Sequence, residues 1–85
     1  MNNFQNIPDN ELFDPSENML AASVDERVYH RVYLSAEYAV NLVENGTPQS
    51  LARAEDVVRA VLKCQELDKK NPHYGNFFWE KEEGI

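Results

Sequence analysis

The side chains best suited to chemistry gather near the end of the chain, in the segment NPHYGNFFWEKEEGI over residues 71–85. Aromatic rings on a loop can stack on the apolar C–H face of a pyranose, because each ring offers a large flat apolar surface. Tyr74 and Trp79 are the residues we consider for such stacking. Packing of the same rings into a core is the alternative interpretation.

An acidic cluster follows Trp79, with Glu80, Glu82 and Glu83 arranged around Lys81. Glycoside cleavage needs two carboxylates at a set separation, one of them with its pKa raised by an apolar setting. Glu80 beside the aromatic rings could supply one of the two. A solvated run of charges is the alternative, and we predict no catalytic residue in this chain.

The remaining reactive residue types predict structural roles. Cys64 is the only cysteine, so no intrachain disulfide can form, and its place beside an apolar stripe indicates a buried structural thiol. His30 and His73 lie far apart, without the spacing of a zinc site. We interpret both as packing or surface residues. We predict no metal and no cofactor.

The overall charge limits the classes of partner. The sequence carries 15 acidic and 8 basic residues, a formal net charge of −7. Such a surface repels phosphate backbones and anionic membranes, so we predict neither nucleic-acid nor membrane binding. The first residues show no basic region followed by an apolar one, and a cytoplasmic location is expected.

The elements that must position these residues are predicted to be two helices. Asp14-Pro15-Ser16-Glu17 has the composition of a helix start, and Ser23-Val24-Asp25-Glu26 repeats that signal. Apolar residues then recur in steps of three and four up to Val43. A strand over residues 28–33 is the rival interpretation, because this segment is rich in β-branched and aromatic residues. The longer helical stripe favours a helix over about 15–45, which a break near residue 23 could interrupt.

A short joint separates this helix from the next. In Asn45-Gly46-Thr47-Pro48, Gly46 can end one helix in the left-handed conformation, while Thr47 caps the next with Pro48 at its first position. The second helix is expected over 48–68, antiparallel to the first. The sequence therefore predicts an all-α antiparallel helical hairpin over 14–70, preceded by an extended arm over 1–13 and followed by an aromatic and acidic loop over 71–85.

The stretch from about Arg27 to Glu83 resembles the first helical hairpin of uncharacterised bacterial proteins of the six-hairpin, (α/α)6-toroid type. That superfamily includes glycoside hydrolases and polysaccharide lyases. The resemblance is carried by residues 36–39, 42–43, 53–54 and 61–65, and most distinctively by residues 72–77 with Trp79-Glu80. It implies a loop beside a central cleft, where four residues would contact a carbohydrate: Tyr74, Asn76, Trp79 and Glu80.

Two functions from different classes follow. The first is the N-terminal structural part of a larger carbohydrate-active or carbohydrate-binding toroid protein, inactive by itself, whose parent could be a glycosidase-like or lyase-like enzyme. A lone hairpin cannot cover its broad apolar face and its aromatic tail. The expected partners are therefore the remainder of a longer chain, or other copies in a homo-oligomer. The alternative is a complete small acidic helical protein that works by protein–protein contact or homodimerisation.

Overall fold

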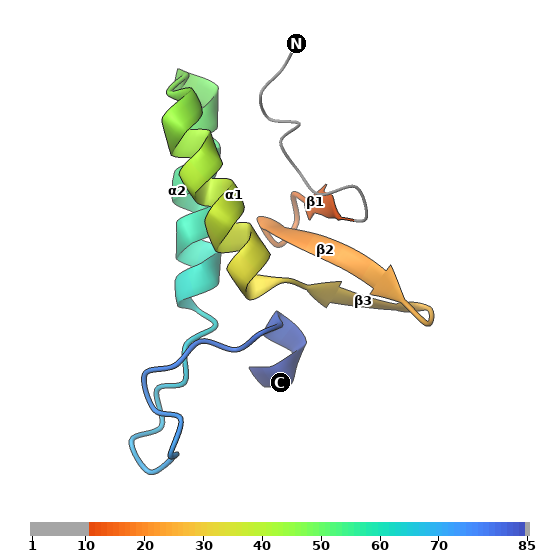
Figure 1. Ribbon diagram of the computed structural model, residues 1–85, viewed down its shortest axis with the longest axis vertical. Coiled ribbons are helices and arrows are strands. Elements are labelled where there is room, and N and C mark those ends of the chain that lie inside the picture. The colour runs from red at the N-terminus through yellow and green to blue at the C-terminus, as the bar shows by residue number, and fades with distance from the viewer. Residues whose placement is uncertain (1–10, 85) are drawn as a thin grey trace.

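The computed structural model describes residues 11–84, which form a small three-stranded sheet packed against two helices (Figure 1). In chain order these are β1 (Leu12–Asp14), β2 (Met19–Val24), β3 (Arg27–His30), α1 (Val32–Asn45), α2 (Pro48–Leu62) and the 3-10 helix η2 (Lys81–Gly84). The sheet is antiparallel with strand order β1-β2-β3. The all-α class predicted from the sequence is wrong, because β2 and β3 lie within the first predicted helix, over about 15–45, and β1 lies just before it. The predicted arm over 1–13 lies mostly outside the described residues.

The first predicted helix start is a turn between β1 and β2. The carboxylate of Asp14 accepts hydrogen bonds from the backbone N–H of Ser16 at 3.0 Å and from its hydroxyl at 2.7 Å. An aspartate that caps its own following backbone in this way forms an Asx turn, and the same local chemistry also begins helices. The Asp-Pro-Ser-Glu pattern therefore indicated the correct capping residue but the wrong element.

The second predicted helix start is the two-residue loop of the β2–β3 hairpin. Asp25 and Glu26 have φ values of +50° and +66°, and Val24 pairs with Arg27 across the loop. A two-residue hairpin loop with both φ values positive matches the right-handed twist of the strands, although Asn-Gly or Asp-Gly usually occupies it. The strand over residues 28–33, rejected in the sequence analysis, is correct for its first three residues.

The helical joint follows the sequence prediction closely. Gly46 ends α1 with φ +72°, and its N–H donates to the carbonyl oxygen of Leu42. Thr47 caps α2 by accepting a hydrogen bond at 3.0 Å from the N–H of Ser50, and Pro48 occupies the first position of the helix. These caps are confirmed. The second helix, however, ends at Leu62 and not near residue 68.

The core lies on both sides of β2. Leu20 packs with α1 and α2 in one buried cluster, which also holds Tyr38, Ala39, Leu42, Ala54 and Val57. Met19 points to the other side and packs with Val32 and Cys64 under the aromatic residues of the C-terminal segment. Since both faces of the strand are covered, Met19, Leu20, Ala21 and Ala22 are all buried. Their unbroken apolar run hid the two-residue period of the strand.

Candidate functional site

Four consecutive residues at the junction of β3 and α1 hold the C-terminal segment in place. We call His30, Arg31, Val32 and Tyr33 the junction. Arg31 forms an isolated β-bridge with Glu80, and the N–H of Val32 donates to the carbonyl oxygen of Trp79 at 3.0 Å. The junction therefore fixes the backbone on which Trp79 stands.

His30 is the polar centre of this arrangement. It is 8% exposed, and its Nδ1 lies 2.7 Å from the carboxylate of Glu82, while its Nε2 lies 2.8 Å from that of Asp14. Glu82 also accepts the backbone N–H of His30 at 2.7 Å. The cluster of His30, Asp14 and Glu82, which we call the histidine clamp, ties β1, β3 and η2 together.

The clamp favours the charged forms of all three groups. Burial alone lowers the pKa of His30, but hydrogen bonds to the two carboxylates outweigh it, and the pKa lies above its ordinary value of 6.5. The hydrogen bond from His30, together with those from Ser16, lowers the pKa of Asp14 to about 2. Burial alone would raise the pKa of Glu82, but hydrogen bonds from the ring and backbone of His30 outweigh it, so the pKa lies below its ordinary value of 4.5.

The clamp is a structural device and not an acid–base catalyst. A general base needs a nitrogen free to take a proton from a substrate, and both ring nitrogens of His30 are occupied by carboxylates. His30 lies in the middle of the helix predicted over about 15–45, which does not indicate this role. A strand over residues 28–33 would place His30 within an extended segment, but its two partners lie 16 and 52 residues away, so no local pattern indicates them.

Beside the junction lies a hollow of about 450 Å³, which we call the aromatic hollow. The exposed ring of Trp79 and the ring of Tyr33 stand at its wall, with centroids 4.8 Å apart and planes tilted by 56°. Phe77 and Phe78 also line it. Its polar lining consists of Glu66, Asn71, His73, Asn76 and Glu83.

The loop over residues 66–76 places the amides of the hollow. An isolated β-bridge between Gln65 and Phe77 closes the loop. Within it, the N–H of Glu66 donates to the carbonyl oxygen of Asn76, and the N–H of Gly75 donates to the carbonyl oxygen of Glu66, both at 2.8 Å. Gly75 has φ +89°, which glycine adopts most readily. The loop is therefore held in one shape by its own backbone.

The structure brings two of the four predicted contact residues into this hollow. Asn76 and Trp79 line it, whereas Tyr74 is half-exposed outside it. Glu80 points to Arg31, at 3.9 Å between Oε2 and a guanidinium nitrogen. Tyr33 was missed, because in the sequence it was one aromatic residue on a long helical stripe. Nothing in the local pattern pairs it with a tryptophan 46 positions later.

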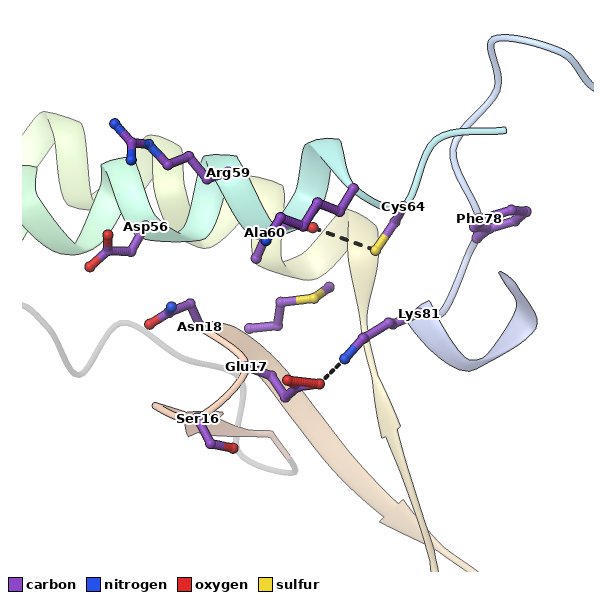
Figure 2. Close-up of a pocket in the computed structure, with 11 residues that line it drawn as sticks. Ser16, Glu17, Asn18, Asp56, Arg59, Ala60, Cys64, Phe78 and Lys81 are labelled. Atoms are coloured by element: carbon purple, nitrogen blue, oxygen red, sulfur yellow. Dashed lines mark hydrogen bonds and ion pairs between the residues drawn. The ribbon is translucent and has the colours of Figure 1, made fainter. Parts of the chain in front are cut away.

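A second hollow, of about 430 Å³, lies between the β1–β2 turn, α2 and η2 (Figure 2). An ion pair between Lys81 and Glu17 crosses it. Cys64 lies at its inner end, with Sγ 3.6 Å from the carbonyl oxygen of Ala60. Burial raises the pKa of this thiol, so it stays protonated and weakly nucleophilic. We assign no chemistry to this hollow.

Two kinds of feature are absent from the described part of the chain. Among residues 11–84, no group of three or more His, Cys, Asp or Glu side chains is arranged to hold a metal ion. Within the same residues, no helix combines the length and the apolar character needed to cross a bilayer.

Comparison with known proteins gives a family without an assigned activity. No curated protein and no solved structure gives a significant match to the chain. No comparison connects it with the six-hairpin toroid proteins, so that resemblance stays a prediction. A family model described as a domain of unknown function, DUF8769, matches residues 5–84, which include the junction, the histidine clamp and the aromatic hollow. The chain therefore belongs to the DUF8769 family.

Proposed function

We propose that the protein binds a neutral carbohydrate in the aromatic hollow. The observation that carries this proposal is the ring of Trp79, which is 71% exposed although its backbone is held by the N–H of Val32. A large aromatic ring buries about 150–250 Å² when it packs, so leaving it in solvent forgoes a strong stabilisation of the fold. A rigidly held, exposed tryptophan is suited to stacking on a sugar ring.

The polar lining suits the hydroxyl groups of such a ligand. A sugar hydroxyl both donates and accepts hydrogen bonds, and the side-chain amides of Asn71 and Asn76 offer both functions. The carboxylates of Glu66 and Glu83 add acceptors. Aromatic surface with a few polar groups around it is the usual composition of a small-molecule site.

The charge of the hollow supports a neutral sugar over an acidic one. Glu66 and Glu83 line the hollow, and the whole chain has a net charge of −7. A uronate would meet repulsion from both carboxylates.

The proposed function is binding of the carbohydrate and not its cleavage. A place within a longer carbohydrate-active protein stays a prediction, as does the cytoplasmic location, with which a buried free cysteine agrees.

Titration calorimetry with oligosaccharides tests the proposal. The panel contains gluco-, xylo- and manno-oligosaccharides, with oligogalacturonate as the acidic comparison. We expect binding of at least one neutral oligosaccharide and weaker binding of the uronate. Trp79→Ala should abolish the heat of binding, and Asn76→Ala should weaken it.

The matched control is Tyr74→Ala. This change removes an exposed aromatic ring that belongs to the loop over residues 66–76, as Asn76 does, but does not line the hollow. It should leave the affinity unchanged. Circular dichroism of each variant checks that the fold is retained. Neutral-sugar binding that survives Trp79→Ala in a folded variant would contradict the proposed site, and no binding across the neutral panel would contradict the function.

A further inference from the structure

The helical hairpin carries an apolar groove of about 360 Å³ between α1 and α2. We call it the hairpin groove. Alanine side chains of α1 are part of its lining, and larger residues of both helices stand along it. The apolar lining includes Ala36, Ala39, Val40, Val43, Val58 and Leu62.

The larger residues of the groove are exposed to a degree unusual for a packed helix pair. Val40, Val43 and Leu62 are each more than half exposed, at 56%, 55% and 54%. Val40 and Val43 are three residues apart on α1, and Val58 and Leu62 are four apart on α2, so each pair forms a continuous stripe. Contiguous exposed apolar surface of this kind marks interaction sites.

The shape of the groove favours a single helix as its occupant. Ala36 is half-buried and Ala39 is buried, whereas the valine and leucine side chains project into solvent. A ridge of side chains from one helix fits between such rows.

The charge around the groove gives the chemistry of that helix. Glu44 lines the groove, and Glu37, two turns earlier on α1, is exposed on the same side of that helix. Two copies that met here would bring these carboxylates together, in addition to the net charge of −7 on each chain. Lysine or arginine residues on an incoming helix would instead be attracted to them.

We propose that the hairpin groove binds an amphipathic helix from a partner protein, with apolar residues at i, i+3 or i+4 and i+7, and with basic residues beside that stripe. This is the mode in which a helix lays its apolar face into a groove. Within residues 11–84, no residue lines both the groove and the aromatic hollow. Helix binding and carbohydrate binding are therefore separate properties with separable tests.

The test uses three labelled peptides of 15 residues, the length of α2. One carries a leucine stripe flanked by lysines, its twin has glutamates in place of the lysines, and the third has the lysine peptide's residues in scrambled order. Fluorescence anisotropy should show binding of the lysine peptide at least about tenfold tighter than of the other two. Higher salt should weaken this binding.

Substitutions in the hairpin groove test whether the lysine peptide binds there. Val43→Asp and Val58→Ser, on different helices of the groove, should each abolish or strongly weaken binding. Leu67→Asp is the matched control, because Leu67 is an exposed apolar residue outside the groove. The affinity of the Leu67→Asp variant for the lysine peptide should equal that of the unaltered protein. Glu44→Lys should reverse the preference between the lysine and glutamate peptides.

Three results would overturn the proposal. The first is equal binding, or no binding, of the lysine and glutamate peptides to the folded protein. The second is binding that persists in both Val43→Asp and Val58→Ser when circular dichroism shows the native helix content. The third is a dimer in sedimentation equilibrium that Val58→Ser dissociates, since the occupant would then be a second copy.

Discussion

Replacing Glu82 by glutamine removes one negative charge from the histidine clamp while keeping the shape of the side chain. Glutamine can still accept the backbone N–H of His30 through its side-chain oxygen, as Glu82 does at 2.7 Å. With that oxygen on the backbone N–H, the new side-chain NH2 group faces Nδ1, which must then accept a hydrogen bond; the change therefore removes the ionic partner of the imidazolium and favours the neutral ring. Its effect measures how much the charged histidine stabilises the attachment of η2 to the sheet.

The magnitude follows from two independent scales. A hydrogen bond to a charged group contributes about 1.5–3 kcal/mol to the free energy of unfolding. On the other side of the clamp, hydrogen bonds from His30 and then from Ser16 lower the pKa of Asp14 from 3.8 to about 2. At 1.36 kcal/mol per pKa unit the whole shift corresponds to at most about 2.5 kcal/mol, and His30 supplies only part of it. The carboxylates of Asp14 and Glu82 are 30% and 28% exposed, so solvent screening reduces the value. We expect Glu82→Gln to destabilise the protein by about 1–2 kcal/mol near pH 6.

The pH dependence of this loss is set by three groups. His30 has its pKa raised above 6.5, so its contribution is complete below pH 6.5 and is lost as the pH rises through the folded-state pKa. The pKa values of Glu82 and Asp14 are lowered from 4.5 and 3.8, so their contributions are complete above those values and are lost in acid. The difference in the free energy of unfolding between the unaltered protein and Glu82→Gln should therefore be largest between about pH 4.5 and 6.5, and should be smaller at pH 9.5.

The assay is thermal unfolding followed by circular dichroism at pH 5.5 and pH 9.5. For a chain of this size, 1 kcal/mol corresponds to a shift in Tm of about 4–8 °C. Glu83→Gln is the matched control, since Glu83 is the exposed neighbour that does not contact His30. The reasoning is refuted if Glu82→Gln and Glu83→Gln lower Tm equally at pH 5.5. It is also refuted if the effect of Glu82→Gln is the same at both pH values.

Chemical denaturation checks three further predictions. Glu26→Gly should stabilise the protein by about 0.5–1 kcal/mol, because glycine adopts φ +66° without strain; a loss of stability would contradict the turn. Leu20→Ala should destabilise it by about 2–5 kcal/mol, since Leu20 is fully buried, and a loss below 1 kcal/mol would not fit that position. Glu11 is buried with no hydrogen-bond partner among the described residues, and its nearest cationic atom, Nε of Arg31, lies 3.9 Å away; burial outweighs this attraction and raises the pKa of Glu11 above 4.5. Glu11→Gln should therefore stabilise the protein by about 1 kcal/mol at pH 7, and a gain equally large at pH 4 would exclude the charge as its cause.

The parts of the fold that could be predicted from the sequence are those specified by neighbouring residues. The caps at Gly46, Thr47 and Pro48 depend on backbone conformations and hydrogen bonds within four residues, and they occur as expected. The strands could not be separated from helix by the same reasoning. Asp14 makes similar bonds in an Asx turn and at a helix start, and β2 lacks alternation because both its faces are covered.

The candidate site depends even more on distant contacts. The exposed tryptophan and the amide of Asn76 were predictable as residue types on a loop. Tyr33, which stands beside Trp79, and the two carboxylates that hold His30 come from segments far apart in the chain. The sheet brings His30 within hydrogen-bond distance of Asp14, and the return of the C-terminal segment to the junction brings Glu82 to His30 and Trp79 to Tyr33.

Trp79 is the only tryptophan of the chain, so its indole N–H gives a single, unambiguous NMR signal. Titration of the ¹⁵N-labelled protein with a neutral oligosaccharide therefore tests the proposed function most directly. We predict a saturable shift of that indole signal together with shifts of the Asn71 and Asn76 side-chain amides. Two results would contradict carbohydrate binding in the aromatic hollow. One is a neutral sugar that binds while the indole signal stays in place, and the other is an indole signal that no neutral sugar of the panel shifts at any concentration.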